Sequence, residues 1–405
     1  MSGKIWKWSP RVLLVGVAIC TVIFLVQYEV RHETTLEAAP YIPAEDGIVL
    51  ETLPFSGDPR LRLWRQWEDQ LSQDPTNLAL ALRLADDYVR AGLTKADPRY
   101  DGYARAALRP WWNDPMPPVE VLRLRVTLQQ RAHQFDPALE DLAKMLHTNP
   151  LHGEAWLAKS VIHQVRGEYV QARQSCLPLI GQVSALVVSS CVANVATVTG
   201  QAEKSFHQLA RSVEQNGSAA THETRWALTI LAETAARLGR WTQAETYFRQ
   251  ALALESSDIY LLSAYSDFLL DRDRAQEVLP LLPGRNLPDA LLLRAALAHR
   301  KLDLPQTSRL VENLENRFRE SRLRGDSRHV REEARFTLVL LNDAGEALKL
   351  AQENWAVQRE PWDTRLVLEA ALAAGQAEAA QPVLQWVTNV GLEDPGIRRL
   401  MEALS

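Results

Sequence analysis

The chain has 405 residues, of which 46% are apolar and 23% are charged. This length is too great for one compact core in most folds, so it predicts several domains or one elongated array. The formal net charge of −5 gives no electrostatic case for nucleic acid as a partner, and three cysteines are too few for a disulfide scaffold and lack the spacing of a zinc site.

The first predicted element is a transmembrane helix at the N-terminus. Residues 1–11, MSGKIWKWSPR, are basic and contain Trp6 and Trp8, which suit a membrane interface. Residues 12–28, VLLVGVAICTVIFLVQY, carry no charge and are near the lower limit of length for a spanning helix. Because the basic flank favours a cytoplasmic N-terminus, we expect a single-pass protein of the inner (plasma) membrane. The bulk of the chain is then on the periplasmic or extracytoplasmic side.

The alternative for this segment is a cleaved signal peptide. The apolar run is at or beyond the upper length for such a peptide. No A-x-A cleavage site follows promptly, because the late LEAAP motif has Glu37 where a small residue is needed. An uncleaved signal anchor is therefore favoured. Residues 29–60 contain several Pro and Gly and little periodicity, so they are predicted to be a tether.

Residues 61–395 are predicted to be helical throughout. Apolar residues recur at three- and four-residue spacing, and the breaks between runs are short and carry Gly, Pro, Asn or Asp. Residues 396–405 are expected to be a tail or a cap. Nine helical hairpins are expected, at residues 61–110 (with an insertion, LTKADPRYDGY), 119–149, 152–182, 186–216, 222–255, 257–282, 288–324, 327–358 and 361–391.

The hairpins repeat one another when they are aligned on the glycine between their two helices. A small residue lies five positions after that glycine in each of four segments. The glycines are Gly167, Gly200, Gly239 and Gly375, and the small residues that follow them are Ala172, Ser205, Ala244 and Ala380.

This pattern resembles the tetratricopeptide repeat (TPR) family. Trp156 matches the leading Trp of the family's first helix, and Ala244, Phe248 and Ala251 match its second helix. The resemblance is strongest over 222–255, while elsewhere the leading Leu-Gly pair is often replaced. It implies an all-α fold, a right-handed α-solenoid of stacked TPR-like helical hairpins, here preceded by one N-terminal transmembrane helix.

The physical reason for the pattern is helix packing. Two antiparallel helices approach closely only where a side chain is small, which is the predicted role of Ala172, Ala244 and Ala380. Phe248 then fills the space between successive hairpins. Since one hairpin cannot bury its apolar face alone, neighbouring hairpins stack into a superhelix with a concave groove.

No catalytic signature is present in the sequence. It lacks G-x-S-x-G, H-E-x-x-H, a P-loop and a Rossmann glycine run, and the repeats leave no room for a catalytic domain. We therefore expect no enzymatic activity and no cofactor. Nine His are scattered, and the nearest set, His147, His152 and His163, is expected to be surface or helix packing rather than a metal site.

Cys176 and Cys191 are predicted to lie on adjacent antiparallel helices, at equal distances from a turn near residues 183–184. A disulfide is geometrically feasible if their faces converge, and an oxidising compartment favours it. The alternative is that both are small packing residues, since Cys176 occupies the position that Phe248 takes in its own repeat.

Two further groups are candidates for partner binding. The segment 317–335 holds seven Arg, which suit an acidic tail or a carboxylate; the alternative is a solvated helix face with internal i,i+4 pairs. The loop LRPWWNDPMPP offers two Trp for an exposed apolar contact, with core burial as the alternative. The candidate residues are Trp111, Trp112, Arg317, Arg324, Arg328 and Arg331.

These features predict a membrane-anchored TPR adaptor or scaffold. It would bind protein or peptide partners in the assembly or maturation of a membrane or secreted complex. Two alternatives stay open at this point. One is a structural, self-associating repeat protein without a client groove, and the other is a regulatory part of an enzyme complex.

Overall fold

The computed structural model describes residues 59–405 except 96, 217–218, 283, 285–286 and 326–328. The predicted basic N-terminus, the transmembrane segment 12–28 and nearly all of the tether lie outside this range. Residues 62–405 form one compact unit. Residues 59–61, the start of α2, are the described end of the other unit, which begins at Met1. No helix between residues 59 and 405, masked positions aside, is both long and apolar enough to cross a membrane.

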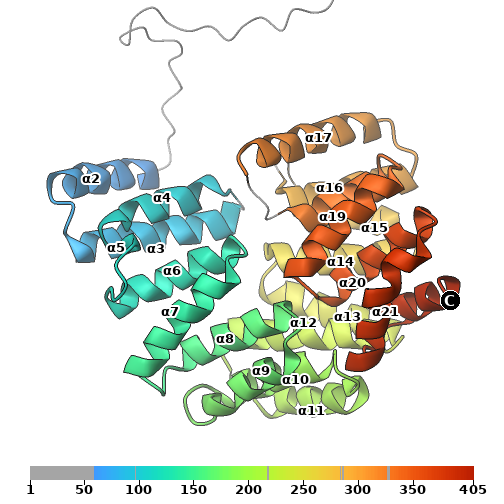
Figure 1. The fold of residues 1–405 in the computed structure, drawn as a ribbon, viewed down its shortest axis with the longest axis horizontal. Helices are drawn as coiled ribbons and strands as arrows, with labels where there is room; N and C mark the ends of the chain where they lie inside the picture. The colour runs from blue at the N-terminus through green and yellow to red at the C-terminus, as the bar shows by residue number, and fades with distance from the viewer. Residues whose placement is uncertain (1–58, 96, 217–218, 283, 285–286, 326–328) are drawn as a thin grey trace, which may run out of the picture. The chain divides into compact units, whose positions relative to one another are not determined.

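The described part of the chain is built from helices, and no residue in it is assigned to a strand (Figure 1). This confirms the all-α class and the stacked helical hairpins. The elements in chain order are α2 (Pro59–Gln73), α3 (Leu78–Lys95), α4 (Arg99–Ala107), α5 (Arg109–Trp112), α6 (Val119–Arg131), α7 (Phe135–Thr148), α8 (Gly153–Val165), α9 (Tyr169–Cys176), η1 (Leu177–Leu179), α10 (Ala185–Ala196), α11 (Ala202–Gln215), α12 (Thr221–Arg237), α13 (Trp241–Leu254), α14 (Ile259–Asp271), α15 (Ala275–Leu281), α16 (Asp289–Lys301), α17 (Thr307–Leu323), α18 (Val330–Val339), α19 (Ala344–Val357), α20 (Pro361–Ala373), α21 (Ala377–Val390) and α22 (Pro395–Ala403).

The first expected hairpin, 61–110, is wrong, because this region forms four helices, α2 to α5. The expected insertion contains the end of α3 and the start of α4. Aromatic packing explains the extra helix: the ring centroids of Tyr88 on α3 and Tyr103 on α4 are 5.5 Å apart, and those of Tyr88 and Tyr100 are 6.1 Å apart. The expected loop around Trp111 and Trp112 is also wrong, since both lie on the helical turn α5.

Each remaining hairpin joins two helices, from α6 and α7 to α20 and α21. The small residues that follow the glycines pack inside the hairpins, and Ala172, Ala244 and Ala380 are fully buried. Phe248 is buried between hairpins, with its ring stacked on Tyr265 at 5.2 Å. Ala251 is also fully buried, while Trp156 is half-buried and donates a 2.8 Å hydrogen bond from Nε1 to the Pro150 carbonyl.

The four aligned glycines have a left-handed backbone, with φ between 65° and 74°. Four other residues in the described ranges have the same conformation without being glycine: His133, Asp273, Asp303 and Asn342, with φ between 51° and 57°. His133 and Asn342 take the place of the glycine in their hairpins, five residues before the buried Ala138 and Ala347. An alignment on glycine alone therefore misses these hairpins.

The last hairpins fold back against the middle of the chain, a contact that an open superhelix does not have. Tyr169 and Val195, from α9 and α10, belong to the same apolar core as Leu366 of α20 and Val387 of α21. Backbone atoms also meet across this seam, since the Arg359 amide donates a 2.7 Å hydrogen bond to the Val165 carbonyl. We call this contact between α8–α11 and α19–α22 the seam.

Candidate functional site

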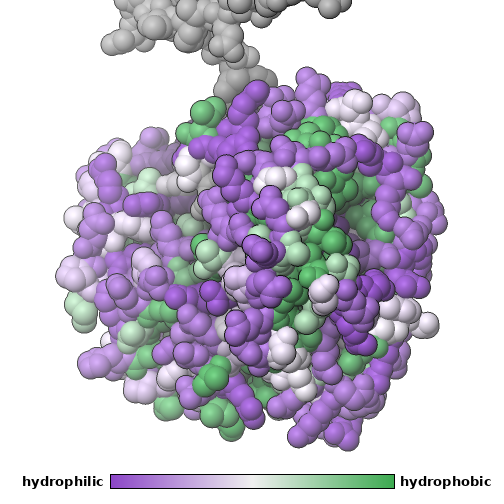
Figure 2. Space-filling model, turned by 45° about the vertical axis from the view of Figure 1, so that its right-hand side comes forward, coloured by the Kyte–Doolittle hydropathy of each residue, from purple (hydrophilic) through white to green (hydrophobic). Residues whose placement is uncertain are grey.

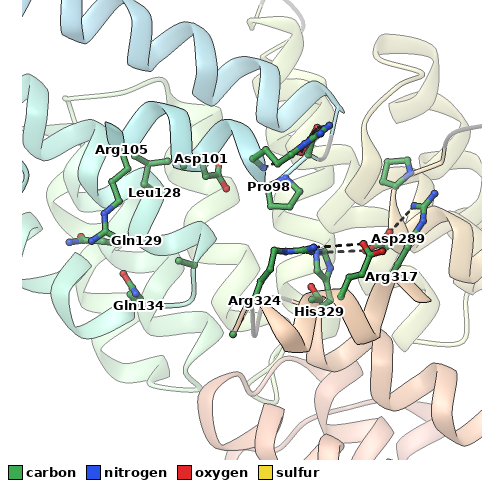
Figure 3. A pocket seen from close by; sticks show the side chains of 18 of the residues that line it. Pro98, Asp101, Arg105, Leu128, Gln129, Gln134, Asp289, Arg317, Arg324 and His329 are labelled. Carbon is green, nitrogen blue, oxygen red and sulfur yellow. Dashed lines mark hydrogen bonds and ion pairs between the residues drawn. The ribbon is translucent and has the colours of Figure 1, made fainter. Parts of the chain in front are cut away.

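A cavity of about 1270 Å³ lies between two parts of the chain that are far apart in sequence. We call it the arm cavity. Its first wall comes from α3 to α6 and the loops beside them, and its second wall comes from residues 287–289, from α17 and from Arg324, Gly325 and His329. Figure 3 shows Arg105 and Gln129 on one side and Arg317, Arg324 and His329 on the other.

The first wall combines an aromatic ring with a guanidinium group. Arg105 on α4 lies over the ring of Trp112 on α5, with its Cζ atom 4.8 Å from the ring centroid, a cation–π arrangement. Gln129 on α6 is only 8% exposed, and its Oε1 atom has no hydrogen-bond partner among the described residues. A buried acceptor without a partner is uncommon, so this wall has unused hydrogen-bonding capacity.

The second wall is ordered by ion pairs. Arg317 on α17 donates to the Leu287 carbonyl at 2.9 Å and to the Asp289 carboxylate at 2.8 Å. His329 Nε2 lies 4.0 Å from the same carboxylate. Arg324, just after α17, reaches Glu320 only at 3.8 Å, and both of these side chains are more than half exposed.

The acids of the lining already have cationic partners. Asp97 pairs with Arg99 at 2.6 Å, and Asp101 pairs with Arg131 at 2.9 Å. Asp289 and Glu320 pair within the second wall, as described above. Arg105, by contrast, has no carboxylate partner within the described ranges. The cavity therefore presents a spare guanidinium on one wall and the weakly held Arg324 on the other, an arrangement suited to a carboxylate.

The structure brings together three of the six residues that the sequence proposed for partner binding. Trp112, Arg317 and Arg324 line the arm cavity. Trp111 is half-buried and is not among its lining residues, and Arg328 lies outside the described residues. Partner binding by any of these residues stays a prediction.

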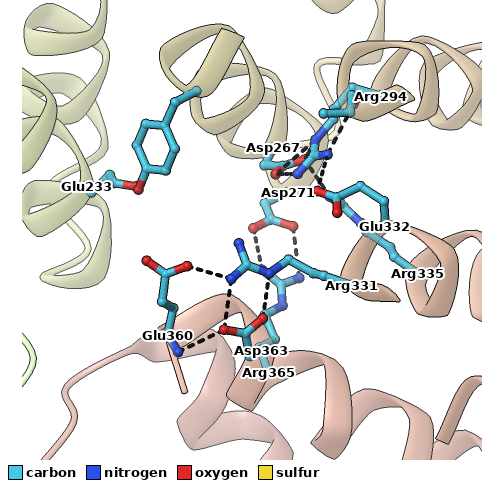
Figure 4. A network of polar contacts seen from close by, with 12 residues as sticks. Glu233, Asp267, Asp271, Arg294, Arg331, Glu332, Arg335, Glu360, Asp363 and Arg365 are labelled. Carbon is cyan, nitrogen blue, oxygen red and sulfur yellow. Dashed lines mark hydrogen bonds and ion pairs between the residues drawn. The ribbon is translucent and has the colours of Figure 1, made fainter. Parts of the chain in front are cut away.

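Arg331 is used inside the molecule instead. It donates to Asp363 at 2.5 and 2.9 Å and to Glu360 at 2.5 Å (Figure 4). It also donates to the side chain of Gln358 at 3.0 Å. Although burial alone lowers it, the pKa of Arg331 is raised well above its ordinary value by Asp363 and Glu360. This guanidinium is therefore committed to internal ion pairs.

A second internal ion cluster lies beside it. Asp267 on α14 is 2% exposed and accepts hydrogen bonds from Arg294 at 2.8 Å and from Arg335 at 2.6 Å (Figure 4). The Arg335 guanidinium also lies 4.7 Å from the ring centroid of Trp362. These contacts join α14, α16, α18 and α20, so in this region the polar interior of the repeats is occupied by the protein's own side chains.

Cys176 and Cys191 lie together as the sequence allowed. Their sulfur atoms are 2.00 Å apart and their Cα atoms are 5.8 Å apart, the geometry of a disulfide. Both side chains are buried, and the Ser160 hydroxyl lies 3.2 Å from the Cys176 sulfur. The oxidation state of this pair in solution stays a prediction.

The histidines singled out in the sequence are separate from the arm cavity. His163 Nδ1 lies 2.6 Å from Glu168, and His152 caps α8 by accepting from the Ala155 amide. Within the part of the chain that the structure describes, no three His, Cys, Asp or Glu side chains form a group suited to a metal ion. His329 lines the cavity, and His133 lies between the lining residues Ala132 and Gln134, with its side chain against Gln358. Sequence reasoning missed His133, although Ala138, five residues later, marks the same repeat position.

Comparisons with known proteins add little to these observations. No protein-family model matches the chain, and no curated protein matches it significantly. Among solved structures, Cut9 of the Cut9–Hcn1 hetero-tetramer aligns with 85% of this chain and 87% of its own, at 12% identity and a TM-score of 0.40. A tetratricopeptide repeat protein from Parabacteroides merdae aligns with 62% of this chain and 98% of its own, at 12% identity and a TM-score of 0.37. PilW, a type IV pilus biogenesis factor, aligns with 70% of this chain and 98% of its own, at 12% identity and a TM-score of 0.34. The description of the fold therefore rests on the hairpins themselves.

Proposed function

We propose that this chain is a non-catalytic helical-repeat adaptor that binds an acidic segment of a partner protein in the arm cavity. The observation that carries the proposal is the lining of that cavity. Its carboxylates are paired, whereas Arg105 is not and Arg324 is held only weakly. Carboxylates of an acidic segment would gain charge-assisted hydrogen bonds from each of these guanidinium groups.

The size of the cavity favours a polypeptide over a small molecule. Sites for drug-sized ligands are usually about 300–1,000 Å³, and this cavity is about 1270 Å³. The half-buried ring of Trp112 and the polar side chain of Gln129 also line the cavity, so an apolar surface and a hydrogen-bonding group stand beside the guanidinium groups. An aromatic ring and polar side chains in one cavity can bind an extended peptide, because the ring contacts one apolar side chain of the peptide and the polar groups hydrogen-bond to the rest of it.

We further propose that residues 12–28 anchor the adaptor in the inner membrane, with residues 62–405 on the periplasmic side. The support is the uncharged run behind a basic N-terminus. An anchor would raise the effective concentration of the cavity near membrane-bound partners. Assembly or maturation of a membrane or secreted complex is the process that such an arrangement would serve.

Self-association through apolar faces is the alternative. Figure 2 shows a mostly hydrophilic face with a band of hydrophobic residues running down it between hydrophilic ones. An exposed apolar surface can contact a partner protein or a second copy of this chain. The identity of the crosslinked protein therefore distinguishes the adaptor from the self-associating protein.

Site-specific photocrosslinking tests the proposal in the full-length protein in its native membrane. A photoreactive residue is placed at Trp112 in the arm cavity, and a matched one at Val170, which is 69% exposed on α9 and outside the cavity lining. We expect a discrete adduct with another protein from position 112 and none from position 170. An Arg105→Glu background should abolish that adduct, because the reversed charge repels an acidic segment.

Two results would contradict the proposal. Equal crosslinking from both positions would show that the cavity is not the binding site. Adducts formed with further copies of this chain would favour self-association.

A further inference from the structure

A chain of three side chains connects the end of α6, beside the first wall of the arm cavity, with α18, which follows the second wall. The Gln358 Nε2 atom lies 2.8 Å from Nδ1 and 2.9 Å from Nε2 of His133. On its other side, the Gln358 Oε1 atom accepts a 3.0 Å hydrogen bond from Arg331. His133 follows α6, Gln358 follows α19, and Arg331 lies in the first turn of α18.

The direction of these hydrogen bonds fixes the protonation state of His133. A guanidinium group only donates, so the oxygen of the Gln358 amide must face Arg331. The amide nitrogen then faces His133 and must donate to it. The ring nitrogen that accepts must carry a lone pair, whereas both nitrogens of a protonated imidazole are donors. The contact therefore requires neutral His133.

These three residues are not part of the cavity lining, but His133 and Arg331 lie beside residues that are. Ala132 and Gln134, the neighbours of His133, line its first wall, and His329, two residues before Arg331, lines its second wall. We propose that His133, Gln358 and Arg331 form a protonation-sensitive clasp that holds the two walls together, so that protonation of His133 releases them and widens the cavity. The proposal assigns regulation to the same cavity, and its biological meaning rests on the proposed function.

The surroundings of His133 agree with a neutral ring. Burial, followed by the charge of Arg331, lowers the pKa of His133 from 6.5 to about 4, and His329 acts in the same direction. Glu332 and Glu360 face it with the opposite effect. The Phe135 ring stacks on the imidazole at 5.7 Å.

The backbone gives independent support. His133 has a left-handed conformation, with φ of 54°, at a position where four other hairpins have glycine. This conformation destabilises a residue that has a Cβ atom by roughly 1–2 kcal/mol relative to glycine. Such a residue persists where its side chain makes a compensating contact, and here that contact is Gln358.

The distance between the walls tests the proposal without any partner protein. Spin labels are attached at Gly102→Cys on α4 and Arg319→Cys on α17 in the full chain, with Cys20→Ser so that residue 20 cannot be labelled. A Cβ at Gly102 meets no atom within 4 Å, and Arg319 is exposed. We expect the distance distribution to shift to longer values when the pH falls from about 7.5 to about 4, where His133 takes up its proton.

Two variants make the test specific. In His133→Asn the side chain cannot be protonated but still accepts from Gln358, and Asn tolerates a left-handed backbone, so the distance should not change with pH. In Gln358→Glu the carboxylate binds protonated His133, so low pH should shorten the distance instead. A pH-independent distance in the unmodified clasp, or the same lengthening in His133→Asn, would overturn the proposal. Because no partner is present, either result is independent of the crosslinking test.

Discussion

The backbone amide of Arg359 donates a 2.7 Å hydrogen bond to the carbonyl of Val165, although the two residues belong to hairpins far apart in the chain. Gly167, just beyond Val165, has φ of 74°, and a Cβ atom placed on it would lie 3.1 Å from atoms of Arg359 and Trp386. The turn after α8 thus serves two purposes. It ends a helix, and it lets the last hairpins approach closely enough to form the seam.

Replacing Gly167 should therefore weaken the seam as well as the turn. Gly375 provides the matched control, because it has φ of 65° and nothing within 4 Å of an added Cβ. Gly375→Ala should cost only the left-handed strain, roughly 1–2 kcal/mol. Gly167→Ala should cost about 1–3 kcal/mol more, because of overpacking against Arg359 and Trp386.

Urea denaturation gives the free energies of unfolding for this pair, and hydrogen exchange reports on the Arg359 amide. We expect faster exchange of that amide in Gly167→Ala and unchanged exchange in Gly375→Ala. Equal destabilisation of both variants would show that the seam contributes nothing beyond the turn.

The hairpins were predictable because their signals are local. Spacing of apolar residues, a small residue such as Ala244 and a turn glycine such as Gly239 all lie within a few residues of one another. The seam was not predictable, because the contact of Gly167 with Arg359 depends on the accumulated curvature of many hairpins. No feature near either residue indicates its partner.

The candidate site was predictable only in part. The density of Arg in 317–335 pointed to a binding surface, and Arg317 and Arg324 do line the arm cavity. The number of Arg residues did not distinguish Arg331 from those that line the cavity. Arg331 instead pairs with Asp363 and Glu360, which come later in the chain. Arg105 was missed because its significance comes from lacking a carboxylate partner among the described residues, which a sequence cannot show.

The Asp267 cluster should be essential for stability. This carboxylate is buried between Arg294 and Arg335, which lower its pKa although burial alone raises it. Asp267→Ala would leave two guanidinium groups without their partner, so we expect a loss of about 3–5 kcal/mol. Lys349→Ala, which removes an exposed pair with Glu346, should cost about 0.5 kcal/mol or less. Chemical denaturation of both variants measures their free energies of unfolding. If Asp267→Ala loses as little as Lys349→Ala, the ion pairs of Asp267 do not contribute the expected stability.

Stability should also depend on pH through His133. Burial and Arg331 lower its folded-state pKa to about 4, below the ordinary value of about 6.5 that the unfolded chain retains. The unfolded state therefore binds the proton first, so the contribution of neutral His133 is complete above about pH 6.5 and is lost as the pH falls toward 4.

Between pH 7 and pH 5 this linkage amounts to about 2 kcal/mol. His133→Asn removes the titrating group, so the variant should lose about 2 kcal/mol less than the unmodified protein over the same interval. Urea denaturation at the two pH values measures the difference, in which the titration of the other histidines cancels. If both proteins lose the same free energy of unfolding between pH 7 and pH 5, His133 is not buried in its neutral form.

The last prediction concerns Cys176 and Cys191, which are separated by 15 residues across the turn between α9 and α10. A crosslink of that span restricts the unfolded chain by about 3 kcal/mol. Alkylation of the unfolded, non-reduced protein, analysed by mass spectrometry, should modify Cys20 alone. Cys176→Ala/Cys191→Ala should then lose about 3 kcal/mol relative to the oxidised protein and less relative to the reduced protein. If all three cysteines are alkylated before reduction, the two buried residues act only as packing side chains against Ser160, and reduction should leave the free energy of unfolding unchanged.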